Sequence, residues 1–251
     1  AGAGPPAPST LVRLLLDPSK GLLVFTPLLL LVPAGLVAAR KKLPARAFVA
    51  LLLAPAAILL TYGGYPNWHG GFTVGARYLV GALPFLLLPL AFVRWGPFAT
   101  ALAGASTAAV ALTTLVFPFV PPGFPLPWGS FSAPLLAKGL VAPNLLHLVW
   151  RPLAIAVPFA LVLAAAFVAV GARRMAPFLL GVIVWTGAGL LLPLFSPLPP
   201  PLLVQRGYVE EVYFGRDGAI ARAMPPGVPV PPRLKARREL EKTLPPPPWP
   251  F

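Results

Sequence analysis

PLAIAVPFALVLAAAFVAVG, residues 152–171, and PFLLGVIVWTGAGLLLPLF, residues 177–195, are two consecutive runs without a single charged side chain. A helix needs about 20 apolar residues to cross the hydrocarbon core of a bilayer. Each run has about that length, and the Arg173-Arg174 pair between them supplies the charge of a short turn. The two runs therefore predict a helical hairpin that crosses a membrane twice.

Further apolar runs precede this hairpin and extend the prediction to an all-α, multi-span membrane protein with about six transmembrane helices. They cover residues 22–39, 47–62, 78–93 and 97–120. Prolines interrupt most of these runs, and a membrane helix tolerates proline because neighbouring groups satisfy the freed carbonyls. We therefore expect kinked helices.

The composition agrees with a lipid environment. Hydrophobic residues make up 57% of the 251 residues and charged residues only 10%, whereas a soluble domain is about one quarter charged. The mean hydropathy is +0.81. The chain has no cysteine, which excludes disulfides and thiolate metal sites. It has only two asparagines and one glutamine, a scarcity of thermolabile amides that favours a thermophilic source.

The net charge of +14 comes from basic residues that flank the apolar runs. Such placement favours anionic membrane lipid over nucleic acid as the partner. Seven basic residues lie in alternate turns and three in the opposite loops, so the positive-inside rule places both termini outside a bacterial cytoplasmic (inner) membrane. The seven are Arg40, Lys41, Lys42, Arg46, Arg94, Arg173 and Arg174, and the three are Arg77, Lys138 and Arg151.

Three parts follow from this pattern. Residues 1–21 form an extracytoplasmic, interfacial N-terminal segment, residues 22–198 the transmembrane domain, and residues 199–251 an extracytoplasmic, Pro-rich tail. β-Branched and aromatic residues flank a Gly-Arg-Asp-Gly sequence at 215–218, which predicts a small β-hairpin in the tail. The start of the chain does not resemble an intact signal peptide, so we expect a fragment of a longer protein.

Acidic residues are absent between Asp17 and Glu210, and this absence limits the chemistry. A buried carboxylate is the usual general acid, metal ligand or proton relay. Asp17 and His69 remain as weak catalytic candidates, although Asp17 beside Pro18 is also typical of a turn residue. No metal-ligand spacing is present, so we predict no metal site in this chain.

The loop YGGYPNWHGGFTVGARY, residues 62–78, concentrates glycines, aromatic residues, a histidine and an arginine in one bend. Glycine lets the backbone approach a ligand closely, and Arg77 can bind a phosphate with two parallel hydrogen bonds. The alternative interpretation is an interfacial turn, in which the aromatic residues and the arginine anchor the loop at the headgroups.

Two stretches resemble a known family. WHGGFTVGARYLVGALPFL, residues 68–86, is similar to the W-x-G-G-x-S-x-G-x-R-Y-L pattern of bacterial, polyprenyl-phosphate-sugar-dependent membrane glycosyltransferases with the type C fold. PSKGLLVFTPLLLL, residues 18–31, resembles the P-S-R-G-L-x-V-Y-S-P stretch that precedes it in the same proteins. Thr73, Thr26, Lys20 and Ala76 depart from the usual residues of these patterns.

The resemblance implies that the chain is the C-terminal half of such a glycosyltransferase-like protein. It implies a polyprenyl-phosphate-linked sugar donor and a glycan, lipid or protein acceptor outside the membrane. The catalytic carboxylate, and with it a divalent cation, would belong to the part that precedes this chain, so no cofactor is expected here. By position, the resemblance assigns donor binding to Lys20, Trp68, His69, Gly70, Gly71, Gly75, Arg77 and Tyr78.

Two other classes of function stay open at this point. A transporter or flippase half for a lipid-linked anion would need a polar pathway through the membrane. A non-catalytic membrane scaffold would need the glycine-rich loop only as a turn.

Overall fold

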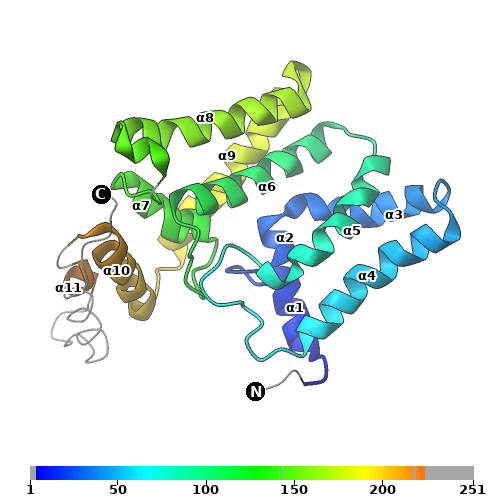
Figure 1. Cartoon of the computed structure of the whole chain (residues 1–251), viewed down its shortest axis with the longest axis horizontal. Helices are drawn as coiled ribbons and strands as arrows, with labels where there is room; N and C mark the ends of the chain where they lie inside the picture. The colour runs from blue at the N-terminus through cyan, green and yellow to red at the C-terminus, as the bar shows by residue number, and fades with distance from the viewer. Residues whose placement is uncertain (1–3, 143, 217–218, 224–251) are drawn as a thin grey trace.

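The computed structural model describes residues 4–142, 144–216 and 219–223, and within these residues the chain is helical without β-strands (Figure 1). Short helices and 3₁₀ turns alternate with long helices. In chain order the elements are α1 (Pro8–Leu16), α2 (Leu22–Phe25), η1 (Pro27–Leu31), α3 (Val32–Arg40), α4 (Ala45–Gly63), η2 (Arg77–Ala82), α5 (Leu83–Leu87), η3 (Leu88–Phe92), α6 (Pro97–Val116), the π-helical turn η4 (Trp128–Ser132), α7 (Ala133–Ala137), η5 (Leu145–Leu148), α8 (Arg151–Val170), α9 (Ala172–Phe195), α10 (Pro200–Phe214) and α11 (Ala219–Ala223).

Four of the described helices are long and apolar enough to cross a membrane: α4, α6, α8 and α9. The expectation of about six such helices is not confirmed, because the first and third apolar runs form shorter segments, Pro27–Arg40 and Arg77–Phe92. Each segment joins 3₁₀ turns to short α-helices that carry proline in the first turn. Repeated prolines remove backbone donors and thereby divide what hydropathy alone predicts as one span.

The α6–α9 pair forms the centre of the helical bundle because glycines let the two backbones touch. A Cβ atom added at Gly104 would lie well under 3.0 Å from the carbonyl oxygen of Phe178 in α9. A Cβ at Gly181 would approach the carbonyl oxygen of Ala101 in α6 equally closely. Small residues at such positions let van der Waals contact drive helix association in lipid, where the hydrophobic effect between helices is absent.

A buried tryptophan packs against the C-terminal half of α9. Trp128 is fully buried, lies against Gly189, and donates its indole N–H to the carbonyl of Trp185 at 2.9 Å. Trp185 in turn donates to the carbonyl of Val24 at 3.2 Å. Phe25 meets Trp128 edge to face, with ring centroids 5.6 Å apart. The π-turn, α9 and α2 are thereby joined through buried aromatic rings.

The connections separate into two groups at opposite ends of the long helices (Figure 1). The turns around Lys42, Arg94 and Gly171 lie at one end, and the loops 64–76 and 117–127 lie at the other. The basic residues of the first group thus share one end of the bundle, as the alternation of charges predicts. Which end faces the cytoplasm stays a prediction.

The predicted β-hairpin in the tail is not confirmed, since its flanks belong to α10 and α11. Pro200 begins α10, and Gly215 ends it in the left-handed conformation at φ 61°. Val209 and Phe214 pack on a buried cluster with Phe117, so tertiary contacts override the strand preference of these side chains. Residues 224–251 of the predicted tail lie outside the described residues.

An ion pair joins α10 to the end of α7. The ammonium group of Lys138, just after α7, lies 2.7 and 2.6 Å from the two carboxylate oxygens of Glu210. Glu210 is only 4% exposed, and Arg206 donates to the carbonyl of Ser130 at 3.3 Å. Burying this carboxylate is tolerable because a cation and a short charge-assisted hydrogen bond compensate its lost hydration.

Candidate functional site

Three segments distant in sequence meet at the end of the bundle opposite the basic turns, and we call this region the loop layer: residues 17–21, 68–78 and 117–127. Its centre is Lys20, whose side chain is fully buried. The Lys20 ammonium donates to the carbonyl of Thr73 and, at 3.0 Å, to the carbonyl of Val120. The amide of Thr73 also donates to the Val120 carbonyl, at 3.1 Å. Lys20 therefore binds the glycine-rich loop to the segment that follows α6.

Burial lowers the pKa of Lys20 from 10.5 to about 8, with Asp17 opposing the shift and Arg77 adding to it. Removal of the ammonium group from water disfavours its charged form, and the nearby guanidinium of Arg77 repels it. At neutral pH Lys20 is still mostly protonated. The loop layer therefore contains two cations close enough to affect each other, although one of them has no contact with solvent.

Asp17 stabilises the turn between α1 and α2. Its carboxylate accepts hydrogen bonds from the backbone N–H of Ser19, at 2.8 Å, and from the Ser19 hydroxyl. The Asp17 carbonyl accepts the amides of Lys20 and Gly21, so the residue organises the turn between α1 and α2. A Cβ at Gly21 would collide with the backbone of Asp17, which is why this tight turn requires glycine. These contacts explain Asp17 without a catalytic role.

The glycines of the loop adopt conformations that other residues avoid. Gly70, Gly71 and Gly75 have φ values of 68°, 74° and 59°. A Cβ at Gly75 would touch the ring of Phe25 at 3.3 Å, so this glycine also permits close packing of the loop on α2. Around Gly71 a Cβ would meet nothing within 4 Å, which leaves its backbone open to approach from outside.

Arg77 is exposed at the start of η2, beside these glycines. A Cβ at Gly70 would lie 3.5 Å from the Nε of Arg77. The guanidinium carbon lies 5.3 Å from the centre of the Tyr78 ring, within the range of a cation–π contact. Tyr78 stacks on Tyr62 with a centroid distance of 4.7 Å and meets the edge of Tyr65. A tyrosine cluster thus supports the guanidinium and leaves its outer face accessible.

Trp68 and His69 form the outer turn of the loop. The Nδ1 of His69 accepts the amide of Gly71 at 3.0 Å, so this ring nitrogen is occupied by the loop itself. The guanidinium of Arg13, on α1, lies 6.0 Å from the centre of the Trp68 ring. The Trp68 side chain therefore contacts α1, and this contact places a second exposed arginine, Arg13, beside the loop layer.

The structure brings together most of the predicted donor-binding residues. Arg77 and Tyr78 lie beside Gly70, and His69 is bound to Gly71, while Lys20 lies behind the loop. The prediction from sequence missed Arg13, because its position on α1 gives no sign that it reaches the Trp68 ring. It also missed that Lys20 binds backbone carbonyls, since these acceptors are 53 and 100 residues away along the chain.

Comparison with known proteins gave no further identification: no family model, curated protein or solved structure matches this chain.

Proposed function

We propose that the loop layer binds the phosphate group of a polyprenyl-phosphate-linked sugar and that the chain is part of a glycosyltransferase-like membrane protein. The observation that carries the proposal is the exposed Arg77 guanidinium, supported on Tyr78 beside the left-handed Gly70. An exposed guanidinium beside an aromatic ring keeps donors available for a phosphate. The resemblance of residues 18–31 and 68–86 to the glycosyltransferase patterns supports the choice of ligand.

The local charge supports an anionic ligand. Arg13, Lys20 and Arg77 contribute three cations to the loop layer, and Asp17 is the one carboxylate beside them within the described residues. The Asp17 carboxylate already accepts two hydrogen bonds from Ser19. Clustered charge of one sign raises the local concentration of the opposite ion. A phosphate at the membrane surface fits this excess of positive charge.

A transporter or flippase half has less support from the described residues. Such a protein needs polar side chains that line a route through the bilayer. The hydroxyls of Ser106, Thr107 and Thr113 in α6 instead donate to carbonyls of their own helix, at 2.9, 2.9 and 2.6 Å. The hydroxyl protons are therefore already used within α6, so these side chains do not form a polar pathway for an ion.

The test is binding of polyprenyl phosphate and of the uncharged polyprenol to the protein in nanodiscs, measured by native mass spectrometry. Arg77→Ala should weaken binding of the phosphate by about 1.5–3 kcal/mol, the usual worth of hydrogen bonds to a charged group, and leave the alcohol unchanged, because only the phosphate meets the guanidinium. Arg46→Ala, at the start of α4 and the opposite end of the bundle, is the matched control and should change neither.

Equal loss of both ligands in Arg77→Ala would indicate a damaged lipid surface, and unchanged binding of both would remove Arg77 from the site. In the complete protein, sugar transfer should fall with phosphate binding. Retained transfer in Arg77→Ala would contradict the proposed role.

A further inference from the structure

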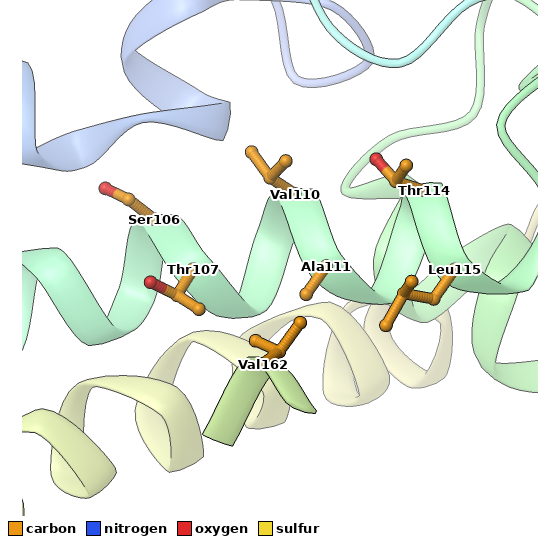
Figure 2. Close-up of a pocket in the computed structure, with 7 residues that line it drawn as sticks. All are labelled: Ser106, Thr107, Val110, Ala111, Thr114, Leu115 and Val162. Atoms are coloured by element: carbon orange, nitrogen blue, oxygen red, sulfur yellow. The ribbon is translucent and has the colours of Figure 1, made fainter. Parts of the chain in front are cut away.

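A second feature lies away from the loop layer, on the membrane-facing side of α6. Two hollows with volumes of about 460 and 370 Å³ follow α6 on the side of α8, and Thr107 lines both. Val162 of α8 borders the first, and residues of both α8 and α9 border the second. We call them together the α6–α8 groove. Figure 2 shows the first hollow, with Thr107, Ala111 and Leu115 on one face of α6 directed toward Val162 of α8.

The groove accepts apolar groups in preference to polar ones. Alanine and valine side chains make up much of its walls. Most of its hydroxyls are engaged within α6, since Thr107 donates to the carbonyl of Ala103 at 2.9 Å and Thr100 to that of Gly96 at 3.0 Å. Ser106 likewise donates to Leu102 and also accepts the amide of Leu28 at 3.0 Å. A polar ligand would find few unpaired hydrogen-bond partners here. A hydrocarbon chain needs no such partners and loses no hydrogen bond on binding.

The shape of the groove suits an extended chain. The first hollow runs along α6 from Ser106 to Leu115, about 14 Å at 1.5 Å per residue. It is an open trough along the helix and not an enclosed cavity. An extended hydrocarbon chain can lie along such a trough in contact with its apolar walls.

The side chains at one end of the groove suit a lipid headgroup. Trp95 and Arg174 line the second hollow, at the end of the bundle that holds the basic turns. Tryptophan is enriched at the membrane–water interface, and arginine there attracts anionic lipid. Arg94 and Arg173 are sequence neighbours of these two residues and add further positive charge to the same end. Charge complementarity therefore selects an anionic lipid.

We propose that the α6–α8 groove binds one acyl chain of an anionic membrane phospholipid, with its phosphate at Arg174. This site does not depend on the proposed donor site, since Arg174 and Arg77 lie at opposite ends of the long helices. The lipid covers the small residues of α6 that α8 leaves exposed to the bilayer and extends the contact between the two helices.

The test uses the full chain in vesicles that contain a phosphatidylglycerol or a phosphatidylcholine with a photoactivatable group on one acyl chain. Peptide mapping after illumination should locate the cross-links on α6 and α8, with the phosphatidylglycerol probe preferred. Thr107→Phe, which adds a ring where the two hollows meet, should reduce these cross-links about tenfold. Val168→Phe, on the outer face of α8 where Val168 is 83% exposed, is the matched control and should leave them unchanged.

The headgroup contact has its own pair of variants. Arg174→Gln should reduce the preference for phosphatidylglycerol about fivefold, the factor that one arginine beside an anionic surface contributes. Arg173→Gln, the neighbouring arginine that does not line the groove, should have a smaller effect. If Thr107→Phe fails to fold, Ala111→Leu blocks the first hollow with a smaller side chain.

Unchanged cross-linking in a folded Thr107→Phe or Ala111→Leu variant would overturn the site. Equal labelling by the two lipids would overturn the choice of an anionic headgroup. A wild-type α6 that neither lipid probe labels would also overturn the site, because another protein surface would then cover the groove. Loss of polyprenyl phosphate binding in Arg77→Ala would not affect any of these results.

Discussion

Helices α6 and α8 have nearly the same length and are both strongly apolar, yet they occupy opposite positions in the bundle. Half of the α6 window is buried, at a mean hydropathy of 1.6, whereas 6% of the α8 window is buried, at the higher hydropathy of 2.7. In a soluble protein the more hydrophobic helix would be expected inside. Here the order is reversed, which is typical of a protein whose solvent is lipid.

The two helices differ in side-chain size as well as in polarity. Gly104, Ala105 and Ala108 of α6 are buried and carry small side chains or none. Leu161, Phe167 and Val168 of α8 are large and exposed. Hydrocarbon chains solvate large apolar side chains as well as other helices do, so close backbone contact and hydrogen bonds between helices distinguish an internal helix from a peripheral one.

The largest expected effect is therefore at the α6–α9 contact. Gly181→Ala would place a Cβ against the carbonyl of Ala101, a backbone atom that cannot rotate away. The helices would have to separate, and we expect a destabilisation of about 3 kcal/mol, the upper end of the usual range for overpacking. Thermal unfolding in detergent measures this loss, and because the chain has no cysteine, the unfolding is followed with a fluorescent dye that does not react with thiols.

Gly187→Ala, in the same helix, is the matched control because a Cβ there meets nothing within 4 Å. Alanine is the better helix former by about 1 kcal/mol, so this variant should be neutral or slightly stabilised. Equal destabilisation by the two substitutions would show that contact with α6 does not determine the cost of adding a Cβ to α9.

The second prediction addresses the exposed helix. Leu161 lies near the middle of α8 and is 65% exposed. On a water-facing surface Leu161→Asp would change stability by no more than about 0.5 kcal/mol. In a bilayer an aspartate at the centre of a helix costs about 2.5–3.5 kcal/mol of insertion free energy. Glycosylation mapping of α8 in microsomal membranes compares Leu161→Asp with Leu161→Ala, and equal insertion would indicate that α8 does not span a membrane.

Hydropathy alone was sufficient to predict the helical membrane class, and the positions of the four long helices follow the apolar runs closely. It was not sufficient to predict six equivalent spans, since the prolines of residues 27–33 and 84–89 divide two runs into 3₁₀ and α segments. The flanks of the predicted hairpin became α10 and α11 because a helix lets Val209 and Phe214 reach the same buried cluster. Local preference is weaker than such tertiary contacts.

For the site, sequence predicted the residues of the glycine-rich loop but not what holds them. The turn role of Asp17 follows from its position before Pro18, because a short side chain beside proline bonds its own backbone. The burial of Lys20 does not follow from sequence, since its acceptor carbonyls could belong to any residues. The Arg13–Trp68 contact likewise requires the packing of α1 beside the loop.

The third prediction concerns Lys20, which joins the end of the buried α6 to the loop layer. Its pKa is about 8 when folded and 10.5 as the reference value, so between these pH values the unfolded chain binds more protons. Stability should consequently rise with pH in this window, by about 2 kcal/mol up to about pH 9.5. The neutral amine keeps two N–H groups for the two carbonyls.

Lys20→Met removes both the titration and the hydrogen bonds. The difference in unfolding free energy between the parent protein and Lys20→Met should therefore grow from about pH 7.5 to about pH 9.5 in favour of the parent. Other titrating groups are common to both proteins and cancel in this difference. Parallel stability curves for the two proteins would mean that Lys20 reaches water.

The smallest expected effect comes from the polar contact that joins α9 to α2. Trp185→Phe keeps an aromatic ring against Trp128 and removes only the N–H that binds the Val24 carbonyl at 3.2 Å. That carbonyl has no substitute in the amide of Leu28, because this amide binds the hydroxyl of Ser106 instead. Hydrogen bonds between membrane helices nevertheless contribute only about 0.6 kcal/mol on average, because the unfolded chain in lipid also finds partners. A loss of about that size in thermal unfolding, much smaller than that of Gly181→Ala, would rank the backbone contact with α6 above the hydrogen bond to α2 as the stronger constraint on α9. A loss as large as that of Gly181→Ala would reverse this ranking.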